Sequence, residues 1–87
     1  AYYPNPFNPR TIISLDVFEN SDFVVYIYDA SGVFVKEIFN GSMLAGSYKF
    51  LWNGINESGS VVSSGIYFCK VIKENRTISS RKMILLK

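Results

Sequence analysis

The stretch that decides the fold is FVVYIYDASG, residues 23–32. Its first part, Phe23 to Tyr28, is the longest apolar run in the chain, and it is too short to span a membrane. Alternate positions on both of its faces are apolar, so we predict a central strand that is covered on both sides. Asp29 to Gly32 then predicts a turn, in which Gly32 supplies a positive φ.

Six further strands are predicted on either side of this run. They cover residues 11–17, 33–39, 48–52, 61–62, 66–72 and 77–86. The turns between them recur about every 8–12 residues, which is the spacing of a β-sandwich. Residues 19–22, 40–46, 53–60 and 73–76 are predicted turns or loops, and no internal repeat is visible. Val35 and Ile38 cannot share one face of a regular strand, so we expect either a bulge near Lys36-Glu37 or a change of sheet.

Composition supports strands and a single domain over residues 1–87. Val, Ile and Thr together number 19 and the aromatic residues 14, whereas Ala numbers only 3 and Leu 5. β-branched and aromatic side chains favour strands over helices.

Prolines at positions 4, 6 and 9 predict an extended lead-in over residues 1–10, anchored by Phe7. Because no signal peptide is visible, we expect a cytosolic protein or a piece of a longer precursor.

The predicted core is built around Trp52. Tyr67-Phe68-Cys69 resembles the tyrosine corner of immunoglobulin-like domains, where Tyr stands two positions before a Cys, and Trp52 would be its aromatic partner. Cys69 is the only cysteine, which excludes an internal disulfide, and we expect it to be a small buried hydrophobe. The residues expected inside are Ile13, Leu15, Val25, Ile27, Val35, Tyr48, Phe50, Trp52, Tyr67, Cys69, Met83 and Leu85.

The residue inventory argues against several functional classes. The chain has no His and one Cys, and its acids are scattered, so we predict no catalytic centre, no obligatory metal and no cofactor. A net charge of +2 does not indicate nucleic acid. Residues 53–60 hold a single acid, Glu57, and fail the calcium-loop pattern. We keep ligand binding as a less favoured hypothesis. The ligand would be a sugar that stacks on exposed Tyr2, Tyr3 or Tyr26, or a calcium ion.

Basic residues gather at the end of the chain. Residues 1–69 carry three basic and six acidic side chains, whereas residues 70–87 carry six basic side chains and only Glu74. One interpretation is a solvated edge strand whose charges discourage pairing with another edge. The other is a positive docking end for an anionic partner.

Six short motifs then occur in an order and spacing that resemble a known family. They are YPNPFNPRT at 3–11, IYDASGVFV at 27–35, LAGSY at 44–48, WNGINESG at 52–59, SGIYF at 64–68 and KMILLK at 82–87. Together the motifs resemble the type A C-terminal sorting domain of the type IX (Por) secretion system. The chain is also similar to the related Ig-like domain of flagellar hook-capping proteins. Val33 departs from the pattern, since Lys or Arg usually follows the turn glycine.

The resemblance implies a seven-stranded immunoglobulin-like antiparallel β-sandwich without a disulfide. It implies a non-catalytic sorting and surface-anchoring signal at the end of a larger exported protein of a Gram-negative bacterium. Its partners would be the outer-membrane secretion machinery, a sortase-like protease and the N-terminal cargo domain of the same precursor. The protein would pass through the periplasm and end secreted or at the cell surface. The signal residues carried over by position are Pro4, Asn5, Pro6, Tyr28, Asp29, Gly32, Gly46, Tyr48, Lys82, Leu86 and Lys87.

A second hypothesis competes with the sorting signal. The same Ig-like fold would serve as a structural accessory or assembly module of the hook-cap type. The two differ in position, because a sorting domain ends its precursor whereas an assembly module can lie inside a longer chain.

Overall fold

The chain forms two antiparallel sheets and no helix in the part described by the computed structural model, residues 11–86. The predicted lead-in at 1–10 and the last residue, Lys87, lie outside these residues. The strands are β1 (Thr11–Val17), β2 (Ser21–Asp29), β3 (Phe34–Met43), β4 (Gly46–Trp52), β5 (Gly65–Lys73) and β6 (Arg76–Leu85). The all-β prediction is confirmed. A search of residues 11–86 finds no helix long and apolar enough to cross a membrane.

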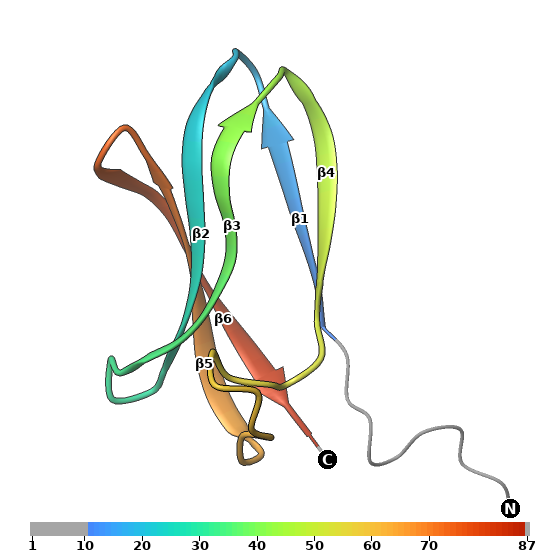
Figure 1. The fold of residues 1–87 in the computed structure, drawn as a ribbon, viewed down its shortest axis with the longest axis vertical. Helices are drawn as coiled ribbons and strands as arrows, with labels where there is room; N and C mark the ends of the chain where they lie inside the picture. Colours follow the sequence, from blue (N-terminus) through green and yellow to red (C-terminus); the bar gives the residue numbers. More distant parts are fainter. Residues whose placement is uncertain (1–10, 87) are drawn as a thin grey trace, which may run out of the picture.

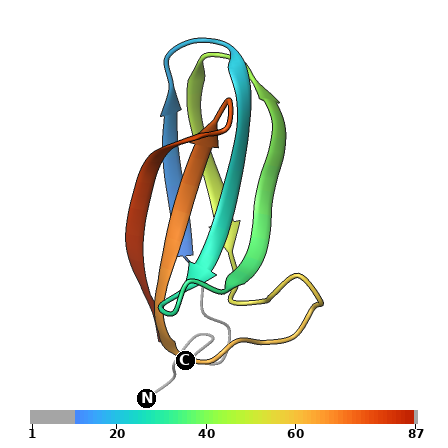
Figure 2. The same cartoon turned by 90° about the vertical axis from the view of Figure 1, so that its left-hand side faces the viewer.

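The larger sheet has the strand order β3-β2-β5-β6, and the smaller sheet pairs β1 with β4. All neighbouring strands are antiparallel. Figures 1 and 2 show the smaller sheet lying against one face of the larger sheet. β2 lies between β3 and β5, so the run Phe23 to Tyr28 is a central strand, as its two apolar faces predict.

Buried residues from both sheets form one cluster. Of the predicted core residues, nine are buried, whereas Tyr48, Phe50 and Met83 are only partly buried and pack against the cluster. The sequence therefore overestimated the burial of those three side chains. They lie on the edge strands β4 and β6, where no neighbouring strand covers one side of each side chain. The buried hydrophobic residues that the predicted core omits are Val17, Phe23, Met43 and Val71.

The predicted seventh strand at Val61-Val62 is wrong for the described residues, which hold six strands. Val61 makes only an isolated bridge with Ile55. The amide of Val62 donates to the carbonyl of Gly54 at 2.9 Å, so this segment closes its own loop. A backbone that satisfies its hydrogen bonds within a loop has few left for a neighbouring strand.

The predicted loop at 40–46 and turn at 19–22 are both shorter than expected. β3 runs on to Met43, which pairs with Ser21, and Ser42 pairs with Asp22. The Ser42 hydroxyl donates to the Asp22 carboxylate at 2.6 Å, so these polar residues extend the hairpin. Polarity alone suggested turns here, but a polar cross-strand pair stabilises a ladder as well.

The irregularity expected in β3 is a bulge, and the strand does not change sheet. The register with β2 skips Ile38 between Phe39 and Glu37, and skips Val35 between Lys36 and Phe34. Each skipped residue is an extra one on β3, which is the definition of a β-bulge. The bulges let Val35 stay buried while Ile38 packs against the core from the edge.

Candidate functional site: two matching turns at one end of the sheets

The turn after β2 is organised by the Asp29 carboxylate. Its Oδ1 accepts hydrogen bonds from the Ser31 amide at 3.0 Å, the Ser31 hydroxyl at 2.9 Å and the Val33 amide at 2.9 Å. Gly32 has φ 87°, a conformation that glycine adopts without steric cost. The amide of Val33, followed by the hydroxyl of Ser31, holds the pKa of Asp29 below its ordinary value of 3.8. The carboxylate is therefore ionised and fixed in place.

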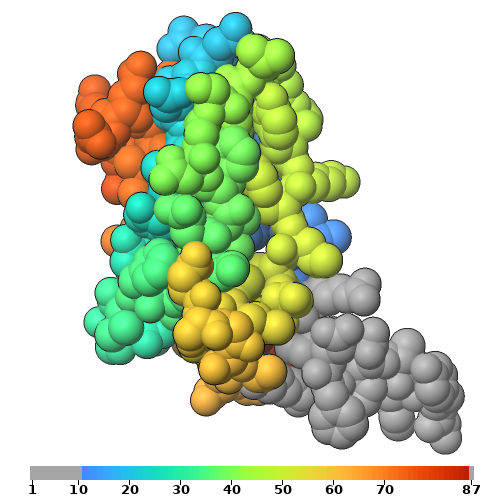
Figure 3. Space-filling model, viewed as in Figure 1, coloured from blue at the N-terminus to red at the C-terminus, as the bar shows by residue number. Residues whose placement is uncertain are grey.

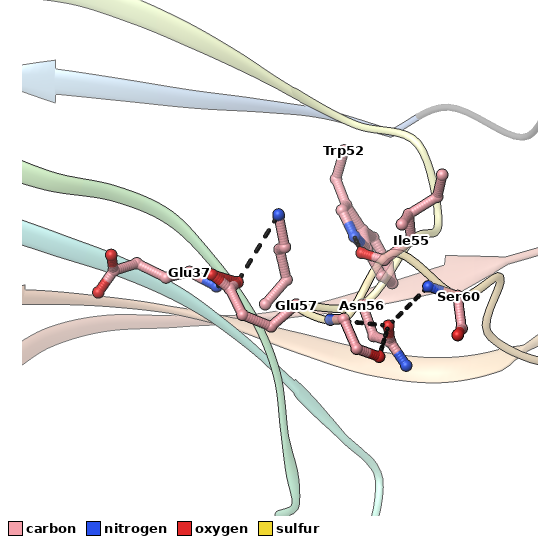
Figure 4. Close-up of polar contacts among 8 residues, drawn as sticks. Glu37, Trp52, Ile55, Asn56, Glu57 and Ser60 are labelled. Atoms are coloured by element: carbon pink, nitrogen blue, oxygen red, sulfur yellow. Dashed lines mark hydrogen bonds and ion pairs between the residues drawn. The ribbon is translucent and has the colours of Figure 1, made fainter.

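A second turn repeats this geometry at Asn56 (Figure 4). The Asn56 Oδ1 accepts from the Ser58 amide at 3.1 Å, the Ser58 hydroxyl at 2.9 Å and the Ser60 amide at 2.9 Å. Gly59 has φ 89° and donates to the Asn56 carbonyl at 3.0 Å, as Gly32 donates to the Asp29 carbonyl at 3.0 Å. The shared pattern is Asp or Asn, any residue, Ser, Gly. The sequence carries it at 29–32 and 56–59, although it is too short to be noticed as a repeat.

Glu57 ties the second turn to β3. Its amide donates to the Val35 carbonyl at 2.8 Å, and its carboxylate accepts from the Glu37 amide at 3.1 Å. The same carboxylate pairs with the Lys36 ammonium at 3.6 Å. These contacts attach the loop to the part of β3 that contains the two bulges. A residue considered only as a poor calcium ligand thus holds a loop in position.

The two turns line one cleft of about 340 Å³, together with Val61, Ser63 and Tyr67. Figure 3 shows the segment after β4 packed beside the turn after β2 at the lower end of the molecule. The Tyr67 hydroxyl donates to the Ser63 carbonyl at 2.6 Å, which confirms the predicted tyrosine corner. Burial, and then the nearby Asp29 charge, raise the pKa of Tyr67 above 10.0.

Trp52 supports this end of the domain from inside. Its ring meets Tyr67 edge-on with centroids 5.0 Å apart, as predicted, and its Nε1 donates to the Ile55 carbonyl at 3.0 Å. Trp52 is 1% exposed. The indole therefore connects the core to the loop that carries the second turn.

Next to the first turn, three aromatic rings form a cluster on the outer face of the larger sheet. Tyr26, Tyr28 and Phe34 meet edge to face, with centroids 5.3–6.1 Å apart. The Lys70 ammonium lies 4.7 Å from the centroid of Tyr28. Lys70 thus covers one face of Tyr28, and edge-to-face packing holds the three rings against one another. Tyr26, the sugar-stacking candidate that the structure describes, belongs to this cluster.

The predicted signal residues fall into separate groups. Tyr28, Asp29 and Gly32 lie together at the first turn. Lys82 pairs with Phe68, which pairs with Tyr28, so Lys82 lies in the same cross-strand row on β6. Gly46 and Tyr48 begin β4 at the opposite end, where the Tyr48 hydroxyl donates to the Leu44 carbonyl at 2.6 Å. Leu86 follows β6 and is 75% exposed. Pro4, Asn5, Pro6 and Lys87 lie outside the described residues.

The described residues hold no group of three or more metal-ligating side chains. Cys69 is buried, and burial raises the pKa of its thiol to about 11. The thiol is therefore protonated at neutral pH and poorly nucleophilic.

The two antiparallel sheets, the shared core and the tyrosine corner define the class of an immunoglobulin-like domain. Residues 9–76 match the family model of the FlgD Ig-like domain, and the chain belongs to that family. The similarity to hook-capping Ig-like domains noted in the sequence is thereby confirmed. No curated protein matches the sequence.

The solved structures that resemble the chain include the following two. FlgD from P. aeruginosa is 28% identical, with a TM-score of 0.66 over 88% of this chain and 58% of that one. Dimeric latent PorU from Porphyromonas gingivalis is 18% identical, with a TM-score of 0.71 over 97% of this chain and 9% of that one. The latter likeness is one of fold. The chain thus spans about half of one of these proteins and a small part of the other.

Proposed function

We propose that this domain is a C-terminal sorting and surface-anchoring signal of a larger exported protein. The observation that carries the proposal is the match of nearly the whole chain to a 9% portion of PorU, which bears the name of the Por system. A module of this size within a much larger chain is what a sorting domain requires. The six motifs that resemble type IX sorting domains support the same function.

The proposed domain acts as an adaptor and performs no catalysis. Its partners would be the outer-membrane secretion machinery, a sortase-like protease and the cargo domain that precedes it. The protein would cross the periplasm and end secreted or at the cell surface. The turn at Asp29 is suited to recognition, because its hydrogen bonds and Gly32 fix the geometry before any partner arrives.

A second candidate function is a structural Ig-like module of the hook-cap type. The match to the FlgD Ig-like family and the 28% identity to FlgD favour it equally. In that role the domain would be a structural part of a larger protein assembly and would carry no export information.

An export assay tests the proposal. Residues 1–87 are fused to the C-terminus of a periplasmic reporter in a host that has the type IX machinery and in the same host without it. We expect the reporter at the cell surface only where the machinery is present. A reporter that stays in the periplasm of both hosts would overturn the proposal and leave the assembly module.

A further inference from the structure

We propose that the open seam between β1 and β6 binds an extended strand of another protein, which places an acidic side chain against Arg81. This inference does not depend on the proposed sorting function. It rests on the edge that β6 leaves open in the larger sheet, on the groove beside it, and on a cation in that groove that has no acidic partner among residues 11–86.

β6 is the last strand of the larger sheet and has β5 as its only neighbour among the described strands. Figure 2 shows it at the margin of the sheet, with β1 of the smaller sheet beside it. An edge strand presents a row of unpaired backbone groups, and an extended peptide can pair with them as an added strand. β6 runs from Arg76 to Leu85, which is long enough to hold such a strand.

A groove of about 270 Å³ follows this seam. Its floor holds Ile13 and Cys69, which are buried, and Met83, which is partly buried. Its rims hold Ile12, which is 64% exposed, and Ile84, which is 61% exposed. An apolar floor and rims on both sides suit alternating apolar side chains.

Arg81 is the charged residue that turns toward this groove from the inner face of β6. It pairs directly with Cys69, so the two side chains share one face of the sheet. Because the two residues are neighbours, the positive charge of Arg81 partly opposes the effect of burial on the pKa of the Cys69 thiol. The two ion pairs among residues 11–86 join Lys36 with Glu57 and Lys73 with Glu19, so Arg81 has no acidic partner there.

Charge complementarity selects the occupant. Among the described residues that line the groove, Arg81 and Lys82 are basic and none is acidic. The best occupant is a strand with an acidic residue opposite Arg81 and apolar residues two positions away on each side. Its acid would pair with Arg81, and its apolar side chains would pack on the floor of the groove. The positions that flank Arg81 on its face, Ser79 and Met83, are both half-buried and would contact those side chains.

Two occupants from this chain fit less well. The lead-in at 1–10 contains no acid, and its three prolines cannot donate to an edge. A second copy pairing through β6 would bring like charges together, because β6 carries Arg76, Arg81 and Lys82 and no acid. The basic residues of β6 repel a second copy of β6 and attract an acidic strand. They therefore disfavour self-association and select an acidic partner.

The test uses the 87-residue chain and three synthetic peptides in which Val alternates with Thr. The central Val position is replaced by Glu, Gln or Lys. We expect the Glu peptide to bind at least about tenfold more tightly than the Lys peptide, measured by fluorescence anisotropy. Arg81→Glu should reverse that order. Arg76→Glu, which makes the same charge change on β6 outside the groove, should preserve it.

Amide hydrogen exchange locates the peptide. Protection should rise at β6 on addition of the Glu peptide and should be unchanged at the edge strand β3. The proposal is overturned by failure of the Glu peptide to bind, by equal affinity for the three peptides, or by protection at β3 instead. It is also overturned if β6 is already protected without peptide. Protection that disappears when residues 1–10 are deleted would show that this segment covers β6. Protection that rises with protein concentration would show that a second copy covers it.

Discussion

The Trp52 indole packs in the core and also holds the loop of the second turn through its Nε1 hydrogen bond. Removal of the ring abolishes both interactions. Trp52→Ala should lower the free energy of unfolding by about 3–5 kcal/mol, because it empties a large buried site and removes the Nε1 bond to Ile55. Denaturant unfolding measures this. Leu51→Ala is the matched control, since the neighbouring Leu51 is 55% exposed and its truncation should cost much less. A loss below about 1 kcal/mol for Trp52→Ala would place the indole outside the core.

Cys69 gives the fold a pH dependence above neutrality. Burial raises the pKa of its thiol from 9.0 to about 11, so between these values the native state keeps a proton that the unfolded state has lost. The native state then binds more protons, and stability falls as pH rises through that interval. Below pH 9 this contribution is fully present.

Unfolding curves at several pH values between 9 and 11 measure the effect. Cys69→Ala should be less stable at neutral pH through lost packing, yet its stability should fall less steeply over the interval. Identical slopes for the parent and Cys69→Ala would show that the thiol does not contribute.

The two matching turns are the elements in which local sequence dictates geometry most directly. Gly32→Ala and Gly59→Ala should each cost about 1–2 kcal/mol, since a side chain at φ 87° or 89° is strained even though space is open around both glycines. The two costs should be similar because the two turns share one hydrogen-bond pattern.

Gly41→Ala is the control for these turns. Gly41 is not among the positive-φ glycines, and an added Cβ would meet the Phe39 ring at an ordinary 3.5 Å. Its stability should change little or increase, as measured by thermal unfolding. An equal loss for Gly41→Ala would show that the turn conformation is not the source of the cost.

Elements with a strong local pattern could be predicted from the sequence. The central place of β2 followed from its two apolar faces, and the bulge in β3 followed from the spacing of Val35 and Ile38. The end of β3 could not be read in this way, because Ser42 and Met43 join the sheet through pairing with Asp22 and Ser21 far away in sequence. Long-range pairing likewise brings the Asp29 and Asn56 turns to one cleft, so that part of the site was missed.

At the scale of the whole molecule, the uneven charge should matter to recognition more than to folding. The double change Lys82→Glu with Lys87→Glu should alter the free energy of unfolding by no more than about 0.5 kcal/mol, because Lys82 is exposed and we expect Lys87 to be exposed as well. On the sorting hypothesis the same change should leave a fused reporter in the periplasm. Cell fractionation measures the export, and denaturant unfolding measures the fold.

A matched control separates this effect from net charge. Lys49→Glu with Arg76→Glu changes the charge by the same amount at exposed positions away from the end of β6. This variant should be exported as the parent is. Normal export of the Lys82→Glu, Lys87→Glu variant would remove the basic end from the signal.

The central claim is that this domain carries export information beyond its fold. The most direct measurement is the fraction of a reporter at the surface of one type IX host, fused either to residues 1–87 or to the Ig-like domain of FlgD from P. aeruginosa. The FlgD domain shares the fold at a TM-score of 0.66 and 28% identity, so it controls for everything that an Ig-like domain does as such. We expect surface reporter with residues 1–87 and periplasmic reporter with the FlgD domain. Equal fractions for the two fusions would contradict the claim.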